Sequence, residues 1–298
     1  MACRSQHDTP PELVGRTERA ELHALAMPRH LRGDIDDVLL DCERLPGMRM
    51  LRIYVPAAEL RGDAPLPLLL VNDGHKAFEP ANHQRVAPWQ QAGTLQLHRV
   101  MDGLLCQGTV RPAVVVAIAT HASSRADQYV PVRTRLGASG FGGLGDLYLD
   151  LLEHEVLPAV RRRLHGVMLA ETAAARILCG TSIGGVSALY GALTRPQTFG
   201  GALALSPSAW VDDGFLQRLV QQHGVAATHI AADIGDGERP PIREHCHRLF
   251  TSLRAHGAPS GAAGPQVFAE EVPGVHNEDS WRQRLPKLLQ HVLGVPAV

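Results

Sequence analysis

The segment that most constrains the fold is a glycine-flanked serine between an apolar run and a helical pattern. Residues 176–179 (RILC) are typical of a short buried strand, residues 186–193 have helical spacing, and Ser182 lies between them. Gly180 and Gly184 stand two residues before and two after the serine, where side chains would collide in a strained strand-to-helix turn. A glycine-rich helix start capped by a serine is the alternative interpretation. The position between a strand and a helix favours the turn and makes Ser182 a candidate nucleophile.

Short apolar runs alternate with helical patterns along most of the chain. The predicted strands cover residues 50–55, 66–71, 113–119, 176–179, 201–205, 230–234 and 267–272. The predicted helices cover residues 89–107, 147–163, 186–193, 244–256 and 281–292. This alternation predicts an α/β fold, with a mainly parallel central sheet and helices on both faces. Because no interior linker or repeat divides the chain, we expect residues 1–30 to form an N-terminal arm and residues 31–298 a single catalytic domain.

The charge balance argues against nucleic acid and membranes as partners. Among 298 residues, 29 are Lys or Arg and 30 are Asp or Glu, which gives a formal net charge of −1. Such a balance produces no field that attracts a polyanion or an anionic membrane. No apolar run reaches the roughly 18 residues that suggest a membrane span. The cysteines are scattered and contain no CxxC pair, and the start of the chain lacks the apolar core of a signal peptide, so we expect a cytoplasmic protein.

A serine nucleophile needs a neighbouring base, and His276 is the best candidate. With this kind of turn the order along the chain is serine, acid and histidine, so the base follows Ser182. Among the histidines after Ser182, only His276 lies in a Pro/Gly loop (PGVHNEDSW) between a predicted strand and the last predicted helix. An exposed loop histidine is the alternative interpretation. His245 and His247 fall on a predicted helix, and a metal site that includes Cys246 has no supporting ligand spacing.

The acid that would orient the imidazole is expected in the loop before the helix at residue 244. That segment (DIGDGE) contains Asp233, Asp236 and Glu238. Asp233 still falls within the strand pattern, which makes it the weakest candidate. Spacing alone does not choose between Asp236 and Glu238, and the carboxylate that is not used would be a solvated turn residue.

Several segments in order resemble the putative-esterase family of α/β-hydrolases, and in particular its enterochelin-esterase-like members. The family also includes esterase D, feruloyl esterases and mycolyltransferases. The similar segments are RIYVP (52–56), LLLVNDGHKAF (68–78), RADQYVP (125–131), LLEHEVLP (151–158), GTSIGG (180–185), TRPQTFGGALALSPSAW (194–210), IGDGE (234–238) and PGVHNEDSW (273–281). The resemblance extends from about residue 48 to residue 292. It implies an α/β-hydrolase fold.

The resemblance also implies hydrolysis of a small-molecule carboxylic ester through an acyl-enzyme, without a metal or cofactor. In the family the acid commonly stands three residues after the turn glycine, which favours Glu238 over Asp236 as the partner of His276. The oxyanion would be bound by the backbone N–H groups of Ile183 and His75. An acyltransferase, a thioesterase or a peptidase could use the same residues, and a non-catalytic binding module could keep the same fold.

The surroundings of the site are expected to be loops. Asp73 precedes the expected oxyanion donor His75, and we expect it to brace the turn and not to take part in the chemistry. Residues 74–90 and 121–146 are expected to border the substrate site, and the second loop contains the glycine-rich stretch GASGFGGLG.

Overall fold

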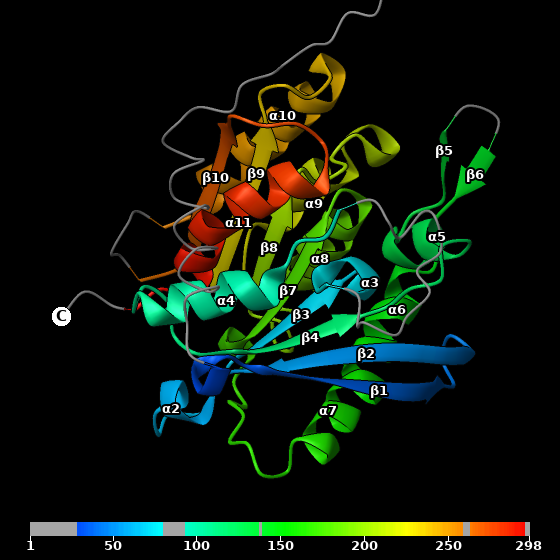
Figure 1. The fold of residues 1–298 in the computed structure, drawn as a ribbon. Coiled ribbons are helices and arrows are strands. Elements are labelled where there is room, and N and C mark those ends of the chain that lie inside the picture. Colours follow the sequence, from blue (N-terminus) through cyan, green and yellow to red (C-terminus); the bar gives the residue numbers. More distant parts are fainter. Residues whose placement is uncertain (1–28, 80–92, 137–138, 259–262, 296–298) are drawn as a thin grey trace, which may run out of the picture.

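An eight-stranded sheet forms the centre of the computed structural model, which describes residues 29–79, 93–136, 139–258 and 263–295 (Figure 1). The strands lie in the order β1 (Asp34–Cys42), β2 (Gly47–Val55), β4 (Val114–Ile118), β3 (Leu68–Asn72), β7 (Arg176–Thr181), β8 (Gly201–Leu205), β9 (His229–Gly235) and β10 (Gln266–Val272). β2 is antiparallel to both β1 and β4. All other neighbours in the sheet pair in parallel, which confirms the mainly parallel sheet.

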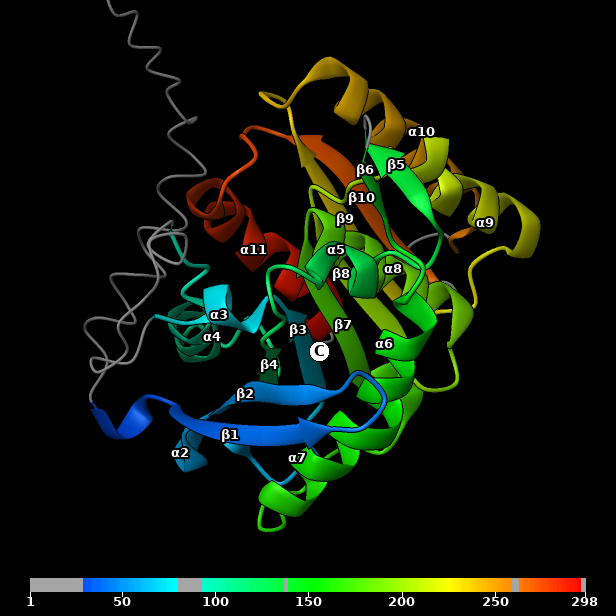
Figure 2. The same ribbon diagram turned by 90° about the vertical axis from the view of Figure 1, so that its right-hand side faces the viewer.

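The central strands are continuous apolar runs because helices cover both of their faces. Leu69 of β3 packs on the face that carries α4 (Leu97–Cys106) and α11 (Glu278–Leu293). Its neighbour Leu70 points to the opposite face. That face is covered by α6 (Gly145–Leu151), α7 (Leu157–Arg163), α8 (Ile183–Thr194), α9 (Phe215–His223) and α10 (Pro240–His256). Figures 1 and 2 show the resulting three layers.

Short elements connect the strands and the longer helices. They are α2 (Ala58–Arg61), α3 (Gly74–Ala77), α5 (Arg125–Tyr129), the hairpin of β5 (Thr134–Leu136) and β6 (Ser139–Phe141), and single 3₁₀ turns at Arg29–Leu31, Ala173–Ala175 and Val211–Asp213. α3 and α5 come after the carboxyl ends of β3 and β4 along the chain. In open α/β sheets ligands bind at this edge, so these connections border the region where a site is expected.

The structure differs from the sequence prediction in its first strand. β1 was not predicted, because its sequence DIDDVLLDC interrupts the apolar positions with aspartates. Among the residues that the structure describes, β1 pairs only with β2 and forms the edge of the sheet, and most of its side chains are exposed or half-buried. A solvated edge strand does not need the apolar run that identifies a buried strand.

Two predicted helices also have different limits. The helix expected over 89–107 begins only at Leu97, because residues 93–96 are not helical and Gln96 has φ of 45°. The helix expected over 147–163 is α6 joined to α7 by a π-helical segment, Leu152–Val156. Pro158 lies two residues after the end of that segment and has no N–H for the carbonyl four residues earlier, a usual cause of local irregularity. Residues 89–92 and residues 1–28 of the expected arm lie outside the described residues.

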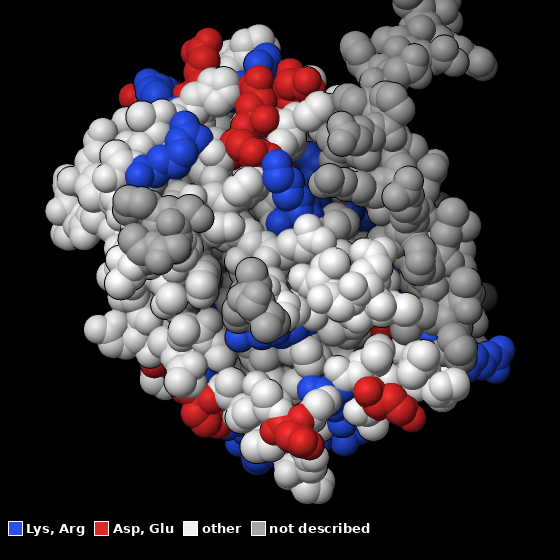
Figure 3. Space-filling model, turned by 90° about the vertical axis from the view of Figure 1, so that its left-hand side faces the viewer, with Lys and Arg blue, Asp and Glu red and all other residues white. Residues whose placement is uncertain are grey.

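The surface and the helices of the described residues show two general properties. On the face drawn in Figure 3, positive and negative side chains lie interspersed, and neither sign covers the face alone. No helix in the described parts of the chain combines the length and the apolar composition that crossing a bilayer requires.

Candidate active site

Ser182 lies in the sharp turn between β7 and α8. Its backbone has φ of 55° and ψ of −123°, a strained conformation for a residue other than glycine. A Cβ atom on Gly180 would come within 2.2 Å of the Gly184 carbonyl oxygen, so this position requires glycine. The Ser182 N–H donates to the Leu205 carbonyl (3.0 Å), and its carbonyl accepts from the Ser208 N–H (3.1 Å). These bonds fix the turn to the end of β8 and place the serine at the start of α8.

A line of hydrogen bonds joins Ser182, His276 and Glu238. The His276 Nε2 lies 3.1 Å from the Ser182 Oγ, and its Nδ1 lies 2.7 Å from the Glu238 Oε2. His276 stands in the loop between β10 and α11, and Glu238 stands in the turn after β9. The His276 side chain is 37% exposed and that of Glu238 is 1% exposed. Solvent therefore reaches the imidazole, while the carboxylate is enclosed behind it.

Glu238 keeps its charge although it is buried. Burial alone raises the pKa of this carboxyl, but hydrogen bonds from His276, from the Ser206 hydroxyl and from the Gly235 N–H lower it, and the net shift is downward. A buried carboxylate with several donors is held in its ionised form. The ionised Glu238 can only accept, so the His276 Nδ1–H donates to it. In the neutral imidazole Nε2 then carries no proton and accepts from the Ser182 hydroxyl.

The two other candidate carboxylates have different partners. Asp236 accepts the Gly274 N–H at its Oδ1 (3.1 Å) and so ties the turn after β9 to the loop that carries His276. Asp233 is fully buried in β9, where its Oδ1 lies 3.3 Å from the Arg284 Nη1. Burial raises the pKa of Asp233 to about 6, against the opposing effect of Arg284. Of the three, Glu238 is the carboxylate that bonds to His276.

Sequence reasoning missed a polar cluster behind Glu238. The Ser206 hydroxyl donates to the Glu238 Oε1 and accepts from the Trp281 Nε1 (2.9 Å) and the Arg284 Nη2 (2.8 Å). Trp281 also packs edge-to-face on His276, with ring centroids 4.9 Å apart. A serine after an apolar strand and an arginine in a helix carry no signal of such a cluster, because both residue types are common on surfaces.

The loop after β3 is braced next to the serine turn. Asp73 has φ of 57°, and its carboxylate accepts two hydrogen bonds from Arg125, at 2.6 and 2.7 Å. The Asp73 N–H donates to the Tyr129 hydroxyl (2.9 Å). A Cβ atom on Gly74 would lie 2.5 Å from the Ala117 carbonyl carbon, so the loop also packs directly against β4. The bonding pattern of Asp73 is that of a structural brace.

Asn72 connects this loop to α8. Its Nδ2 donates to the Gly184 carbonyl (2.9 Å), and its Oδ1 accepts from the Tyr148 hydroxyl (2.7 Å). Ile183 is the first residue of α8 and His75 is the second residue of α3, so both expected oxyanion donors belong to the first turn of a helix. The first N–H groups of the 12-residue helix α8 have no acceptor within that helix, and its dipole favours negative charge beside them.

His245, Cys246 and His247, which the sequence places close together, each contact a different partner. Cys246 is buried and its Sγ lies 3.2 Å from the Pro207 carbonyl oxygen, whereas the His247 Nε2 lies 2.7 Å from a Glu271 carboxylate oxygen. His245 contacts Arg248 instead. Among the residues that the structure describes, no group of three or more His, Cys, Asp or Glu side chains is arranged to hold a metal ion.

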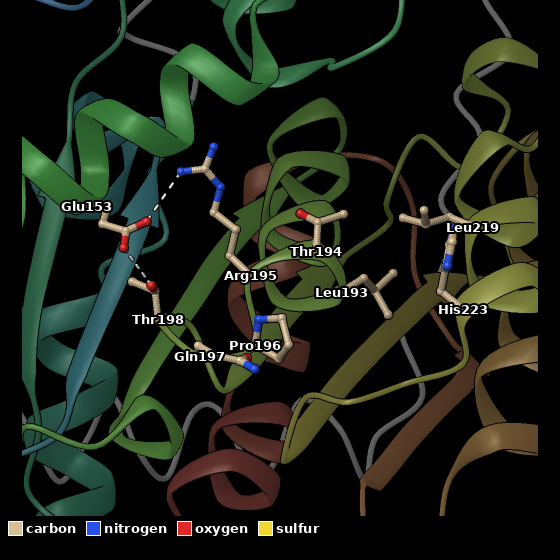
Figure 4. A pocket seen from close by; sticks show the side chains of 9 residues that line it. All are labelled: Glu153, Leu193, Thr194, Arg195, Pro196, Gln197, Thr198, Leu219 and His223. Carbon is tan, nitrogen blue, oxygen red and sulfur yellow. Dashed lines mark hydrogen bonds and ion pairs between the residues drawn. The ribbon is translucent and has the colours of Figure 1, made fainter.

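A hollow of about 700 Å³ lies at the far end of α8 (Figure 4). Its lining includes Glu153, which bonds to Thr198 (2.8 Å) and pairs with Arg195 (3.3 Å). Ser182 precedes the first residue of this 12-residue helix, so roughly 18 Å of helix separates it from the hollow. The hollow is therefore distinct from the Ser182 site, and its one carboxylate is already bonded to Thr198 and Arg195.

The sheet order, the helical layers and the serine at the β7–α8 turn define an α/β-hydrolase fold. The chain belongs to the family described as Putative esterase, whose model matches residues 42–292. The family resemblance seen in the sequence is therefore confirmed.

Two curated proteins that are similar to this chain are named as esterases. The chain is 33% identical over 149 residues to the siderophore triacetylfusarinine C esterase of Aspergillus fumigatus, a match that covers 50% of this chain and 46% of that protein. It is 28% identical over 162 residues to the iron(III) salmochelin esterase of Escherichia coli O6:H1, which covers 54% of this chain and 32% of that protein. The match thus spans about half, or less, of the length of these curated relatives.

Solved structures share the fold at lower identity. The enterobactin esterase of Shigella flexneri has a TM-score of 0.67 and 22% identity, and the match covers 87% of this chain and 58% of that one. An IroE-like serine hydrolase of Shewanella oneidensis has a TM-score of 0.66 and 19% identity, with 87% and 79% of the two chains covered. At these identities the likeness concerns the fold.

Proposed function

We propose that this protein is a serine-dependent carboxylic-ester hydrolase, with Ser182 as nucleophile, His276 as general base and Glu238 as the acid that orients it. The proposal depends above all on the hydrogen-bonded line from the Ser182 Oγ through both ring nitrogens of His276 to Glu238. A hydroxyl becomes nucleophilic at neutral pH when a neighbouring base can take its proton, and this geometry provides one. We further propose that residues 31–298 act as one catalytic domain.

In the proposed reaction the Ser182 oxygen attacks the ester carbonyl carbon while its proton passes to the His276 Nε2. The carbonyl oxygen becomes an oxyanion, which the backbone N–H groups of Ile183 and His75 stabilise. The intermediate expels the alcohol, which takes the proton from His276 and leaves an acyl-enzyme. Water then attacks the acyl carbon by the same route, and the acid product leaves with Ser182 restored. Glu238 stays ionised throughout and stabilises the imidazolium.

No step of this route requires a metal or an organic cofactor. The turn at Ser182 supports it electrostatically, because the first turn of α8 carries the positive end of the helix dipole. Burial lowers the pKa of His75, so its imidazole is neutral at neutral pH. The oxyanion would therefore be stabilised by backbone dipoles and not by a second charged imidazole.

For the substrate class we propose siderophore esters. The curated relatives that match the chain are named as esterases of triacetylfusarinine C and of iron(III) salmochelin. The match to the first of these reaches 33% identity, which makes triacetylfusarinine C the first compound to test.

The test is product analysis by liquid chromatography and mass spectrometry, with simple p-nitrophenyl esters and with triacetylfusarinine C as substrates. Wild-type protein is expected to release the free acid and alcohol, and Ser182→Ala is expected to lower turnover by roughly 10⁴-fold. Adding alcohol acceptors separates hydrolysis from acyl transfer, because a transferase would form the new ester in preference to the acid. Activity of Ser182→Ala near that of the wild type would overturn the proposal.

A further inference from the structure

The direction of each hydrogen bond at Ser206 is fixed by the chemistry of its neighbours. The Trp281 Nε1 and the Arg284 Nη2 both lie within 2.9 Å of the Ser206 Oγ, and both groups can only donate. The hydroxyl therefore uses its two lone pairs to accept from them. Its single proton remains for the Glu238 Oε1. Ser206 is thus held as a donor to the carboxylate that bonds to His276.

Arg284 is a buried cation, and some of its N–H groups lack hydrogen-bond acceptors among the described residues. Its side chain is 2% exposed, and the carboxylate of Asp233 beside it is fully buried. Within the described residues, the Arg284 Nε and Nη1 have no hydrogen-bond partner, and neither has the Asp233 Oδ2. A buried ion pair with unsatisfied atoms contributes little to stability and is commonly neutral or unfavourable compared with apolar side chains. The well-formed hydrogen bond of this guanidinium is the one to Ser206.

We propose that Ser206 and Arg284 are positioning residues for the site: Ser206 holds the Glu238 carboxylate against His276, and Arg284 fixes the Ser206 hydroxyl as a donor to that carboxylate. This inference rests on the proposed function. It assigns a role to two buried residues that touch neither the substrate nor the reacting atoms.

The charged and titratable groups around Glu238 come from several elements. They are His276 from the loop before α11, Asp233 from β9 and Cys246 from α10, and Arg284 of α11 pairs with Asp233 and bonds to Ser206. Arg284 is the permanent cation in this set, because His276 is positive only when protonated. Removing Arg284 takes away one of the two donors that fix the Ser206 hydroxyl, so the hydroxyl can turn away from Glu238. A carboxylate that loses a hydrogen-bond donor has a higher pKa.

Carbon-13 NMR of the Glu238 carboxyl group, followed as a function of pH, tests the proposal without the need for turnover. Ser206→Ala and Arg284→Met are each expected to raise the pKa of Glu238 by about one unit. Arg284→Lys should raise it less, because an ammonium group can still donate to the Ser206 hydroxyl. The matched control is Lys287→Met, which removes a cation one helical turn further along α11 that pairs with Glu270 at the surface. An unchanged titration of Glu238 in folded Ser206→Ala and Arg284→Met would overturn the proposal.

Kinetics provide a second test that a purely structural role would not pass. The acidic limb of the kcat/KM profile should move to higher pH in Ser206→Ala, because the carboxylate that stabilises the imidazolium is protonated earlier. Ser206→Ala is also expected to lower kcat roughly 10-fold in the wild-type background and to have no further effect in Glu238→Gln, since the two act as one unit. Equal losses in both backgrounds would contradict the proposal. If the NMR shift is seen but wild-type protein shows no Ser182-dependent turnover, the proposed function fails and the effect on Glu238 stands.

Discussion

The Glu238 Oε2 lies 2.7 Å from the His276 Nδ1, although 38 residues separate the two along the chain. The pairing arises because β9 and β10 are adjacent parallel strands, and each residue follows the carboxyl end of one of them. Asp236, two residues before Glu238, bonds instead to the Gly274 N–H. Removing one or the other of these two carboxylates is therefore expected to affect activity differently.

The first prediction compares these two carboxylates. Glu238→Gln removes the charge that orients and stabilises the imidazole, and it is expected to lower kcat by roughly 10³-fold or more. Asp236→Asn keeps an acceptor for the Gly274 N–H and is expected to stay within about 3-fold of wild type. Steady-state kinetics on one ester substrate measure both. A larger loss of kcat in Asp236→Asn than in Glu238→Gln would mean that Asp236, and not Glu238, is the acid of the site.

The second prediction concerns the serine turn. Gly180→Ala places a Cβ atom within 2.2 Å of a backbone carbonyl, so the turn must distort. We expect a loss of at least about 2 kcal/mol in the free energy of unfolding and near-complete loss of activity. Gly166→Ala is the control, because its Cβ would meet no atom within 4 Å. Urea unfolding and esterase assays of the two variants should differ clearly, and wild-type behaviour of Gly180→Ala would contradict the geometry of the turn.

The third prediction concerns the brace of the loop after β3. Tyr129→Phe leaves the Asp73 N–H without its hydroxyl acceptor and loosens the loop that carries His75. We expect kcat to fall roughly 10-fold with little change in KM, because an oxyanion donor acts mainly on the transition state. Tyr190→Phe, which removes an exposed hydrogen bond to Asp146, serves as the matched control. If Tyr129→Phe and Tyr190→Phe have the same kcat and KM, the loop after β3 does not contribute to the proposed oxyanion site.

The fourth prediction is a pH dependence of stability that arises from His98. Burial lowers the pKa of His98 to about 4, and Arg99 and Arg52 add to the effect. Because the folded value lies below the ordinary 6.5, the unfolded chain binds the proton first, and stability present above pH 6.5 is lost as the pH falls toward 4. Between pH 7 and pH 5 His98 should therefore lower the free energy of unfolding by about 2 kcal/mol.

The variant His98→Leu tests this prediction directly. The free energy of unfolding of both proteins is compared at pH 7 and at pH 5. The decrease between these two values is expected to be about 2 kcal/mol smaller in His98→Leu than in the wild type. His165→Leu, at an exposed position, is expected to follow the wild type. If urea titrations give the same pH dependence for His98→Leu and the wild type, His98 does not contribute to the pH dependence of stability.

The layered fold could be predicted from the sequence because its signals are local. The apolar runs of β3 and β4 and the glycines around Ser182 each identify their element within a few residues. β1 escaped prediction because an edge strand rich in aspartate lacks the apolar run of a buried strand. The π-helical segment Leu152–Val156 has no sequence pattern of its own and depends on how α6 and α7 pack.

The candidate site was predictable only where chain order and turn chemistry restrict the choice. Ser182 and His276 could be selected in this way, whereas Glu238 was chosen over Asp236 through the family resemblance. The contacts of Ser206 with Trp281 and Arg284 span 75 and 78 residues, and no local pattern encodes them. Such contacts follow from the register of β8, β9 and α11 and need the structure to be found.

The central claim is that Ser182 is an activated nucleophile, and intact-protein mass spectrometry after treatment with a fluorophosphonate probe tests it most directly. Wild-type protein is expected to gain one adduct, and Ser182→Ala is expected to gain none, because only a serine beside a proton acceptor reacts readily. Folded wild-type protein that gains no adduct, or a Ser182→Ala variant that gains the same adduct, would contradict the account.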